Sequence, residues 1–350
     1  MPYRSSILKG IARGHLPRRV GTALLAVAVW MTGGCPSKQS QLLTSSVTPE
    51  QLADPVREAV ADAVGSTDPS QRSHGFECVG LMARDVQVVR WLEAGLTDRV
   101  PAVRFAAAMA TGDVQALSLQ GELRLMLDDP SASVKMAAAY ALEQMGDSSL
   151  KSWYDYVLAG EDPMLTAQAC LILGKLGVTP LREDSSGKLW ALLRKERQHP
   201  TIRLQAAEAL ARLGDKQILK TLLGYANSGF ADDRILAIGG LQHSRDPIAT
   251  SMLITLTEDP QAEVQLAAIR ALGPQAGPDH RKLIRKGLNY RDPQGDEVRT
   301  ERVRGLAILA LGATATSDEL PLLAAQLKQD NPYLRITATR ATLDYLNRVE

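Results

Sequence analysis

The chain has 350 residues, of which 45% are hydrophobic and 4% aromatic, and its 40 Lys and Arg residues nearly balance its 39 Asp and Glu residues. A formal net charge of +1 gives no support to a nucleic-acid-binding protein that relies on overall charge, and the ordinary hydrophobic content argues against a disordered chain. Three cysteines are too few to hold a chain of this length together by disulfide bonds.

Positions 1–34 have the organisation of a secretory signal peptide. Five basic residues and no acidic residue precede an apolar run from Val20 to Met31, and small residues follow at positions 32–34. The apolar run is shorter than the roughly 20 residues that a membrane-spanning helix needs. We therefore expect residues 1–34 to direct export and to be removed.

Cys35 directly follows Gly33-Gly34 and resembles the lipid-modified cysteine of a bacterial lipobox. The resemblance implies a lipoprotein of the cell envelope, on the periplasmic face or the cell surface, whose lipidated Cys35 and flexible residues 35–47 form a tether. The position three before the cysteine is usually Leu, Val or Ile, but here it is Thr32, so a soluble secreted protein and an uncleaved anchor remain alternatives. Without residues 1–34 the chain has 35 basic and 39 acidic residues, so lipid and not charge would attach it to a membrane.

From Thr48 onwards the chain repeats one pattern about nine times. Counted from an aliphatic residue at position zero, the pattern has a basic residue at +1, Ala at +4, a small residue at +7 and Leu at +8, as in residues 134–142. A degenerate copy starts at Ser73. Position zero of the other copies falls at Val103, Val134, Leu165, Ile202, Asp233, Val264, Val303 and Leu334. Most of these copies follow one another at the same interval, and insertions at 178–186 and 289–297, which we expect to be surface loops, lengthen two of the intervals.

Positions 0, +4, +7 and +8 lie on one face of an α-helix, so each copy predicts an amphipathic helix. A second helix precedes each copy, as at 216–225 and 248–256, and Pro in the connecting turn, as in Asp259-Pro260, separates the two. Glycines that we expect to end the repeat helices as left-handed caps stand at Gly146, Gly177, Gly214, Gly273 and Gly312. About nine such helix pairs predict an all-α fold, an α-solenoid over residues 48–350.

The Asp-Pro turns, the basic residue at +1 and the Ala-Leu-Gly endings resemble HEAT repeats, in particular the short repeats of phycobilisome lyases. The resemblance covers residues 48–350. In that family the turn Asp and the +1 basic residue of neighbouring repeats pair as a ladder. The resemblance therefore implies a structural ladder made of Asp98, Arg104, Asp129, Lys135, Arg203, Arg234, Arg304 and Arg335, which Thr166 and Gln265 interrupt.

No motif in the chain points to catalysis. The five histidines form no HExxH motif and no pair at metal-ligand spacing, and the chain lacks the His-Glu dipeptides that a HEAT-repeat iron hydroxylase uses. Three repeats separate Cys78 from Cys170, so we expect a packing role for Cys170 and no disulfide between the two. We predict no enzyme, no cofactor and no metal.

The most variable position of the repeat helix is +6, which holds Met109, Tyr140, Leu171, Glu208, Gly239, Arg270, Leu309 and Arg340. Solenoids bind partners on a concave surface made by the second helix of each repeat, so this row without Gly239 is the predicted partner-binding face. The leading hypothesis is a lipid-anchored scaffold that binds a protein partner and no nucleic acid. The alternatives are a lyase-like protein that handles a chromophore or another small ligand, by analogy of fold alone, and a structural spacer in the envelope.

Overall fold

The computed structural model describes residues 47–147, 154, 157–158, 162–177, 185–277 and 279–349. The predicted signal peptide, Cys35, the tether up to residue 46 and residues 178–184 of the first insertion lie outside these described residues. Every regular element in the described part is a helix, which confirms the predicted all-α solenoid.

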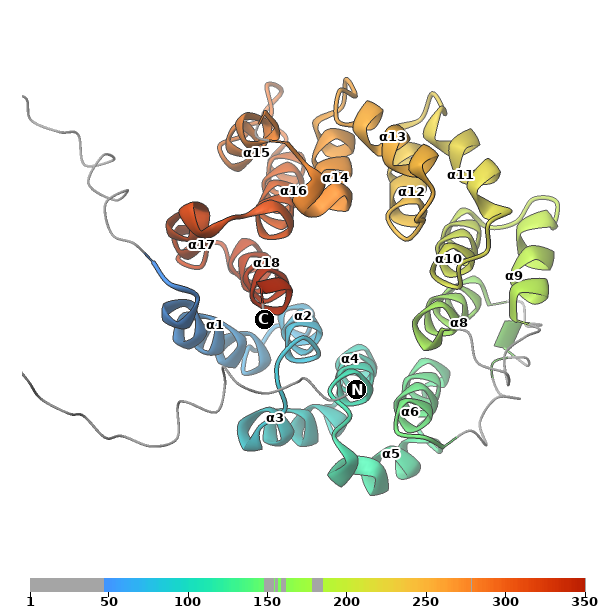
Figure 1. Ribbon diagram of the computed structural model, residues 1–350. Helices are drawn as coiled ribbons and strands as arrows, with labels where there is room; N and C mark the ends of the chain where they lie inside the picture. Colours follow the sequence, from blue (N-terminus) through green and yellow to red (C-terminus); the bar gives the residue numbers. More distant parts are fainter. Residues whose placement is uncertain are drawn as a thin grey trace, which may run out of the picture.

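The helices form two concentric layers (Figure 1). The outer layer contains α1 (Pro49–Val64), α3 (Val86–Leu96), α5 (Gln120–Met126), α9 (Ser185–Arg194), α11 (Ile218–Ala226), α13 (Pro247–Leu256), α15 (His280–Leu288) and α17 (Leu320–Gln326). The inner layer contains α2 (Pro69–Val79), α4 (Pro101–Asp113), α6 (Ala132–Gln144), α8 (Pro163–Leu176), α10 (Pro200–Arg212), α12 (Ala231–Leu241), α14 (Ala262–Leu272), α16 (Glu297–Thr314) and α18 (Pro332–Val349). Short 3-10 helices η3 (Leu117–Leu119), η6 (Gly273–Gln275) and η7 (Ser317–Glu319) lie in connections between the layers.

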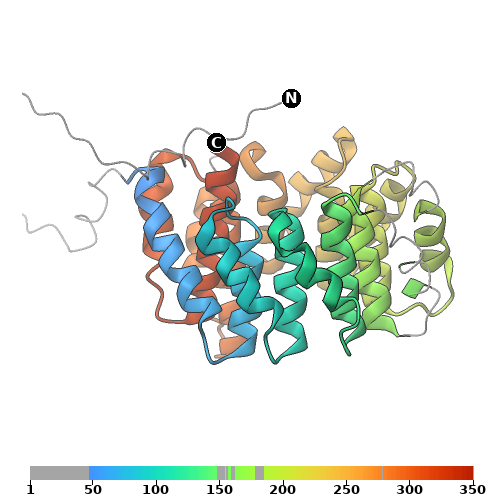
Figure 2. The same cartoon turned by 90° about the horizontal axis from the view of Figure 1, so that it is seen from below.

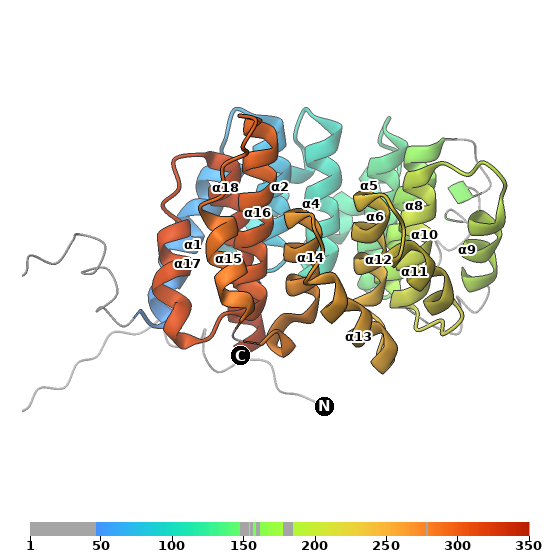
Figure 3. The same cartoon turned by 90° about the horizontal axis from the view of Figure 1, so that it is seen from above.

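The solenoid closes into a ring. Each inner helix packs against the next, and α18 packs against both α1 and α2, so the last repeat is a neighbour of the first (Figure 1). The side views show the inner helices standing next to one another around the ring (Figures 2 and 3). We call the α18 contact with α1 and α2 the seam. The concave surface predicted from the sequence is therefore the inner face of a closed ring.

The repeat alanines lie where the helices are packed most closely. Ala138, Ala206 and Ala268, all at position +4, have no exposed surface. Proline at the first helical position and an Asp cap begin several helices, and Asp162 accepts hydrogen bonds from the N–H groups of Met164 and Leu165 at the start of α8. Apolar burial on one helix face and capping at the helix start together explain why each repeat unit folds as a helix pair.

The terminal glycines divide into two kinds. Gly146, Gly177, Gly214 and Gly273 have positive φ. Gly146 and Gly214 are the predicted caps, since the N–H groups of Asp147 and Asp215 after them bond to the carbonyls of Leu142 and Leu210. Gly177 and Gly273, with ψ of −176° and −131°, lie outside the left-handed helical region. The prediction is wrong for Gly312, which lies inside α16 and has no positive φ. A Cβ at this position would lie 2.3 Å from the carbonyl oxygen of Ala341 in α18, so Gly312 is required by helix packing and not by a turn.

The register of the first repeat also needs correction. Arg72 donates to both carboxylate oxygens of Asp98 at 2.8 and 3.0 Å, as the +1 residue of a repeat does. Position zero is therefore Gln71 and not Ser73. With this register the small, buried residues Gly75 and Cys78 occupy +4 and +7. The sequence reading missed this because the repeat has no aliphatic residue at position zero.

Both described cysteines are free and buried. Burial raises the pKa of the Cys78 and Cys170 thiols to about 12, so neither forms the nucleophilic thiolate near neutral pH. Cys78 lies at the seam, where its Sγ is 3.8 Å from the Ile336 carbonyl oxygen of α18.

We expect native protein at pH 8 to resist alkylation at both thiols, and we expect Cys78 to react before Cys170 in mild denaturant. The seam joins the two ends of the solenoid without a covalent connection, so it should separate before the α8 interfaces do. Peptide mapping by mass spectrometry after timed iodoacetamide treatment distinguishes the two cysteines. Equal labelling rates would show that the seam is no weaker than the other interfaces.

Candidate partner-binding face

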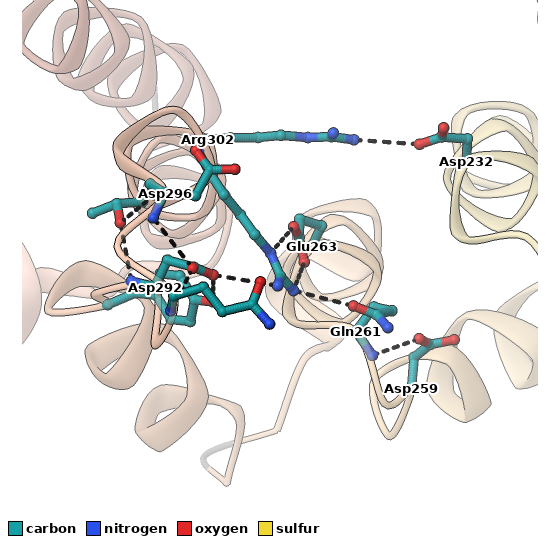
Figure 4. Close-up of polar contacts among 11 residues, drawn as sticks. Asp232, Asp259, Gln261, Glu263, Asp292, Asp296 and Arg302 are labelled. Atoms are coloured by element: carbon teal, nitrogen blue, oxygen red, sulfur yellow. Dashed lines mark hydrogen bonds and ion pairs between the residues drawn. The ribbon is translucent and has the colours of Figure 1, made fainter.

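Two ion pairs skip a repeat and so define the face of the inner helices that points to the middle of the ring. Lys175 Nζ of α8 lies 2.7 Å from a carboxylate oxygen of Asp113 in α4. Arg302 of α16 extends past α14 to a carboxylate oxygen of Asp232 in α12, 3.5 Å away (Figure 4). The inner helices lie closest together on the side that faces the middle of the ring. Only on that side can a side chain reach from one helix across its neighbour to the next.

Position +6 shares this inner face with position +10, one helical turn further along. Glu208 at +6 accepts a hydrogen bond of 2.8 Å from Arg212 at +10 of the same helix, and it lies 3.8 Å from Nε2 of His243 at +10 of α12. Asp113 and Lys175 also occupy position +10. The inner face is thus wider than the predicted row, and the sequence reading missed +10 because it followed the pattern only to +8.

The predicted partner-binding residues do not all reach the surface. Leu171, Glu208, Arg270, Leu309 and Arg340 are partly exposed. Met109 and Tyr140 are buried, at 8% and 2% exposure, so the prediction that they offer a contact surface is wrong. Tyr140 donates a hydrogen bond to Asp113, and Lys175 lies over its ring at 5.2 Å from the centroid, so it connects three repeats instead of facing a partner.

The corrected register adds Glu77 of α2 to the +6 row. Its carboxylate lies 3.3 Å from Nη1 of Arg340, the +6 residue of the last repeat, so this pair crosses the seam. Tyr333 donates to Asp68 at 2.6 Å, and Asn347 donates to the Leu81 carbonyl at 2.9 Å, also across the seam. The seam is therefore held by polar contacts in addition to the buried contact of Cys78.

Burial and neighbouring charges shift the titration of the inner-face groups in different directions. Desolvation raises the pKa of Asp344 although Arg340 and Arg270 oppose it. Desolvation and the charge of Arg340 lower the pKa of Arg270. For Glu208 desolvation acts to raise the pKa, but the imidazole of His243, 3.8 Å away, and the hydrogen bond from Arg212 outweigh it and lower the value. These shifts show that charged groups from four repeats lie close enough to influence one another.

The second insertion builds a polar network at the rim where α14 meets α16 (Figure 4). Arg299 donates to Glu263 at 3.0 Å and to the buried carboxylate of Asp292 at 3.3 Å. Asp292 also accepts from Tyr290 and from the backbone N–H groups of residues 294 and 296. Residues 289–296 form a largely exposed loop, as predicted, and this network anchors the loop to α14 and α16.

A ladder is present at three steps, each joining the +1 arginine to the turn Asp of the next repeat, and two of its residues, Arg72 and Asp259, were not among those predicted. Arg72–Asp98, Arg104–Asp129 and Arg234–Asp259 have closest N–O distances of 2.8, 2.8 and 2.6 Å.

Other predicted ladder residues make different contacts. Arg304 donates to the Tyr290 carbonyl at 3.0 Å, and Arg335 lies 3.6 Å from Asp62 across the seam. The Nε atom of Arg203 is buried without a hydrogen-bond partner. No ion pair of Lys135 occurs among the described residues. At these positions the described residues do not form the ladder contact that Arg72, Arg104 and Arg234 make.

Residues 250–343, which extend from α13 into α18, match the family of HEAT repeats. No curated protein sequence matches the chain.

Three solved structures illustrate the architectural likeness. Human deoxyhypusine hydroxylase in complex with glycerol is 18% identical, with a TM-score of 0.34 over 75% of this chain and 98% of its own. The complex of CpcE and CpcF of phycocyanin lyase from Nostoc sp. is 18% identical, with a TM-score of 0.32 over 91% of this chain and 99% of its own. Kap121p bound to Nup53p is 16% identical, with a TM-score of 0.32 over 83% of this chain and 37% of its own. Likenesses of this degree carry no information on activity or partner.

Within the described ranges, no three or more His, Cys, Asp or Glu side chains are grouped so that they could hold a metal ion. No helix in the same ranges is long and apolar enough to cross a membrane.

Proposed function

We propose that this protein is an exported, lipid-anchored scaffold that holds a protein partner on the inner face of its ring. The observation that carries the proposal is the concentration of charged side chains on this face, where helix packing does not require them. Arg270, for example, is partly exposed and makes no ion pair with any described residue. Such groups are available to a partner without unfolding any repeat.

The pattern of variation supports recognition of a specific partner. Positions +4 and +7 are small in almost every repeat because the helices approach closely there, whereas +6 and +10 change from repeat to repeat. Each sector of the inner face therefore offers a different combination of charge and shape. Solenoids use such a surface to select one extended partner.

The proposal is tested by crosslinking intact envelopes and capturing the bound partner. Capture is compared between a variant of an inner-face arginine and a variant of an outer-face arginine. Arg270→Gln removes an inner-face charge that makes no ion pair among the described residues, whereas Arg90→Gln removes an exposed charge from α3 on the outer face. We expect the first change to abolish capture and the second to preserve it, with equal thermal stability. Equal capture by both variants would contradict the proposal.

Lipid anchoring rests on residues 1–35 alone. We expect Cys35→Ala to move the protein from the detergent phase to the soluble fraction, because the acyl chains would be lost. Phase partitioning of radiolabelled or immunodetected protein measures this. A Cys35→Ala protein that stays with the membrane would disprove the lipobox interpretation while leaving the inner-face proposal intact.

A second candidate function is the handling of a small ligand. A cavity of about 370 Å³ lies between α15, α18 and the loops beside them, and its lining includes His280, Arg281, Tyr345 and Arg348. Its volume falls in the range of small-molecule pockets. Native mass spectrometry of purified protein would favour this function if it showed a retained small ligand. The expectation that the chain is not an enzyme stays a prediction.

A further inference from the structure

The outer face of α15 carries a concentration of positive charge. Its four exposed basic side chains, called the basic patch below, are Arg281, Lys282, Arg285 and Lys286. The helix contains no acidic residue. Arg281 lies 3.5 Å from Glu319, whereas the other three make no ion pair with any described carboxylate. Positive charge without a partner in the described ring is therefore gathered on one short helix.

This arrangement disfavours the isolated helix. The pairs 281/285 and 282/286 place like charges four residues apart, where they repel each other. Arg281 and Lys282 also stand in the first turn, where the positive end of the helix dipole disfavours cations. The apolar side of α15, with Leu283, Ile284 and Leu288, already supplies the packing against the inner layer. On the opposite side, Arg281 contacts Glu319, and Arg285 and Lys286 stand in the last turn, where the helix dipole favours cations. Packing of α15 requires no further charge there.

An outer helix elsewhere in the ring carries the opposite charge in an equally regular arrangement. Four exposed carboxylates recur every fourth residue of α1, and we call them the acidic stripe: Glu50, Asp54, Glu58 and Asp62. At the rise of an α-helix, the stripe from Glu50 to Asp62 is about 18 Å long. Asp62 lies 3.6 Å from Arg335, but Asp54 and Glu58 make no ion pair in the described part of the chain.

The basic patch and the acidic stripe do not neutralise each other within one ring. Helix α17 lies between α1 and α15 in the outer layer (Figure 1). Residues 320–326 of α17 include no charged residue. Beside this helix, Glu319 contacts Arg281, and Lys328 lines a pocket together with Glu58 and Asp62, so each surface meets one opposite charge and keeps its excess of one sign. Both surfaces point outwards, so each is open to another molecule.

We propose that the acidic stripe of one ring binds the basic patch of a second copy of this chain. The contact is heterologous, because different surfaces of the two copies meet, and repetition of the contact gives chains or closed assemblies of rings. An anionic membrane would satisfy the basic patch alone and would leave the acidic stripe unexplained. A second copy satisfies both, and every molecule carries both surfaces.

Sedimentation equilibrium of the full-length protein in detergent, at low and high salt, is the first test. We expect assemblies larger than one ring at low salt and single rings at high salt, because the screening length falls from about 30 Å at 0.01 M to about 3 Å at 1 M. Wild-type protein that sediments as a single ring at low salt would overturn the proposal.

Charge reversal provides the sharper test. One variant carries K282E, R285E and K286E, the other carries E50K, D54K and E58K, and both leave Arg281 and Asp62 with their partners inside the ring. We expect each variant alone to lose the low-salt assemblies, since each then has two surfaces of the same sign. An equal mixture should recover them, because opposite charges again face each other. A mixture that stays as single rings would contradict the proposal.

A matched control separates this specific contact from general charge effects. The exchange R90E with E93R keeps the net charge and alters an exposed part of the outer helix α3. We expect it to retain the assemblies, and the melting temperature of every variant checks the fold. Vesicles of phosphatidylglycerol test the membrane alternative with Cys35→Ala protein. If this protein binds the vesicles, K282E/R285E/K286E abolishes the binding, and neither charge reversal affects the assemblies, then the basic patch binds a membrane and the proposal is overturned.

Discussion

Gly312→Ala is expected to lower the free energy of unfolding by about 3 kcal/mol, the upper part of the usual range for overpacking. The added Cβ would lie 2.3 Å from the carbonyl oxygen of Ala341 and 2.7 Å from its carbonyl carbon and Cα. All three atoms belong to the backbone of α18, so no rotation of a side chain relieves the contact. The inner helices α16 and α18 must move apart, which also disturbs the seam beyond α18.

The same helix provides the control. A Cβ at Gly305 would have Leu334 Cδ2 and Thr337 Cγ2 as its nearest neighbours, both at 4.0 Å. Gly305→Ala should therefore stabilise the protein by up to about 1 kcal/mol, because Ala favours a helix more than Gly does. Chemical denaturation followed by circular dichroism measures both changes. Equal effects of the two substitutions would show that α16 and α18 are not in the close contact described.

The same contact recurs around the ring, which explains why these glycines are needed. A Cβ at Gly112 would lie 2.7 Å from the Cα of Ala141, and one at Gly174 would lie 2.9 Å from the Cα of Ala209. In each case a glycine at +9 packs against an alanine at +7 of the next inner helix. The repeat pattern in the sequence already includes a small residue at +7. Gly312 is predicted as a cap from the sequence, although Ala313-Thr314 after it can continue a helix.

The periodicity of the sequence was sufficient for the helix pairs and their buried faces, because each depends on contacts within one repeat or with the next repeat. Closure of the ring was not predictable in this way. It depends on the sum of small rotations between successive repeats and on contacts between residues far apart, such as Glu77 with Arg340. The pattern within one repeat predicts neither the summed rotation nor these distant contacts.

The candidate site was predictable in part for the same reason. Variation at +6 correctly separated this position from the core pattern, but it did not reveal that Tyr140 would be covered by Lys175 and Asp113 from other repeats. Those contacts exist because the inner face narrows as the ring closes. Position +10 could have been found from the sequence, since +6 and +10 are one helical turn apart.

Arg104→Met is expected to cost about 3 kcal/mol at pH 7, the lower end of the range for breaking a buried ion pair. Arg104 holds both carboxylate oxygens of Asp129 at 2.8 and 2.9 Å and also donates to the Asp98 carbonyl at 2.8 Å. The two side chains are 14% and 9% exposed, so water cannot replace the lost hydrogen bonds fully. Met fills a similar volume, which leaves the uncompensated charge of Asp129 as the main effect.

The cost should depend on pH with a defined sign. Desolvation acts to raise the pKa of Asp129, but the hydrogen bonds from Arg104 and the Ser131 N–H outweigh it, so the folded protein has a lowered pKa. The pair therefore stabilises the fold fully above the unfolded pKa of about 3.9, and this stabilisation disappears as the pH falls through the lower, folded value. Without Arg104 desolvation dominates, and protonation of Asp129 relieves its penalty. We expect the difference between wild type and Arg104→Met to be largest at neutral pH and to shrink below about pH 4.

Two further variants isolate the ion pair as the cause. Arg104→Met with Asp129→Asn removes both charges and should recover much of the stability at pH 7, because no unpaired buried charge remains. Arg124→Met breaks a longer contact of 3.8 Å to Asp147, in which the arginine side chain is 56% exposed, and should change the stability by less than about 0.5 kcal/mol. Urea denaturation at pH 7 and pH 3 gives all the values. A loss in Arg104→Met that is the same at both pH values would mean that the arginine acts through packing and its bond to Asp98, and not through the charge of Asp129.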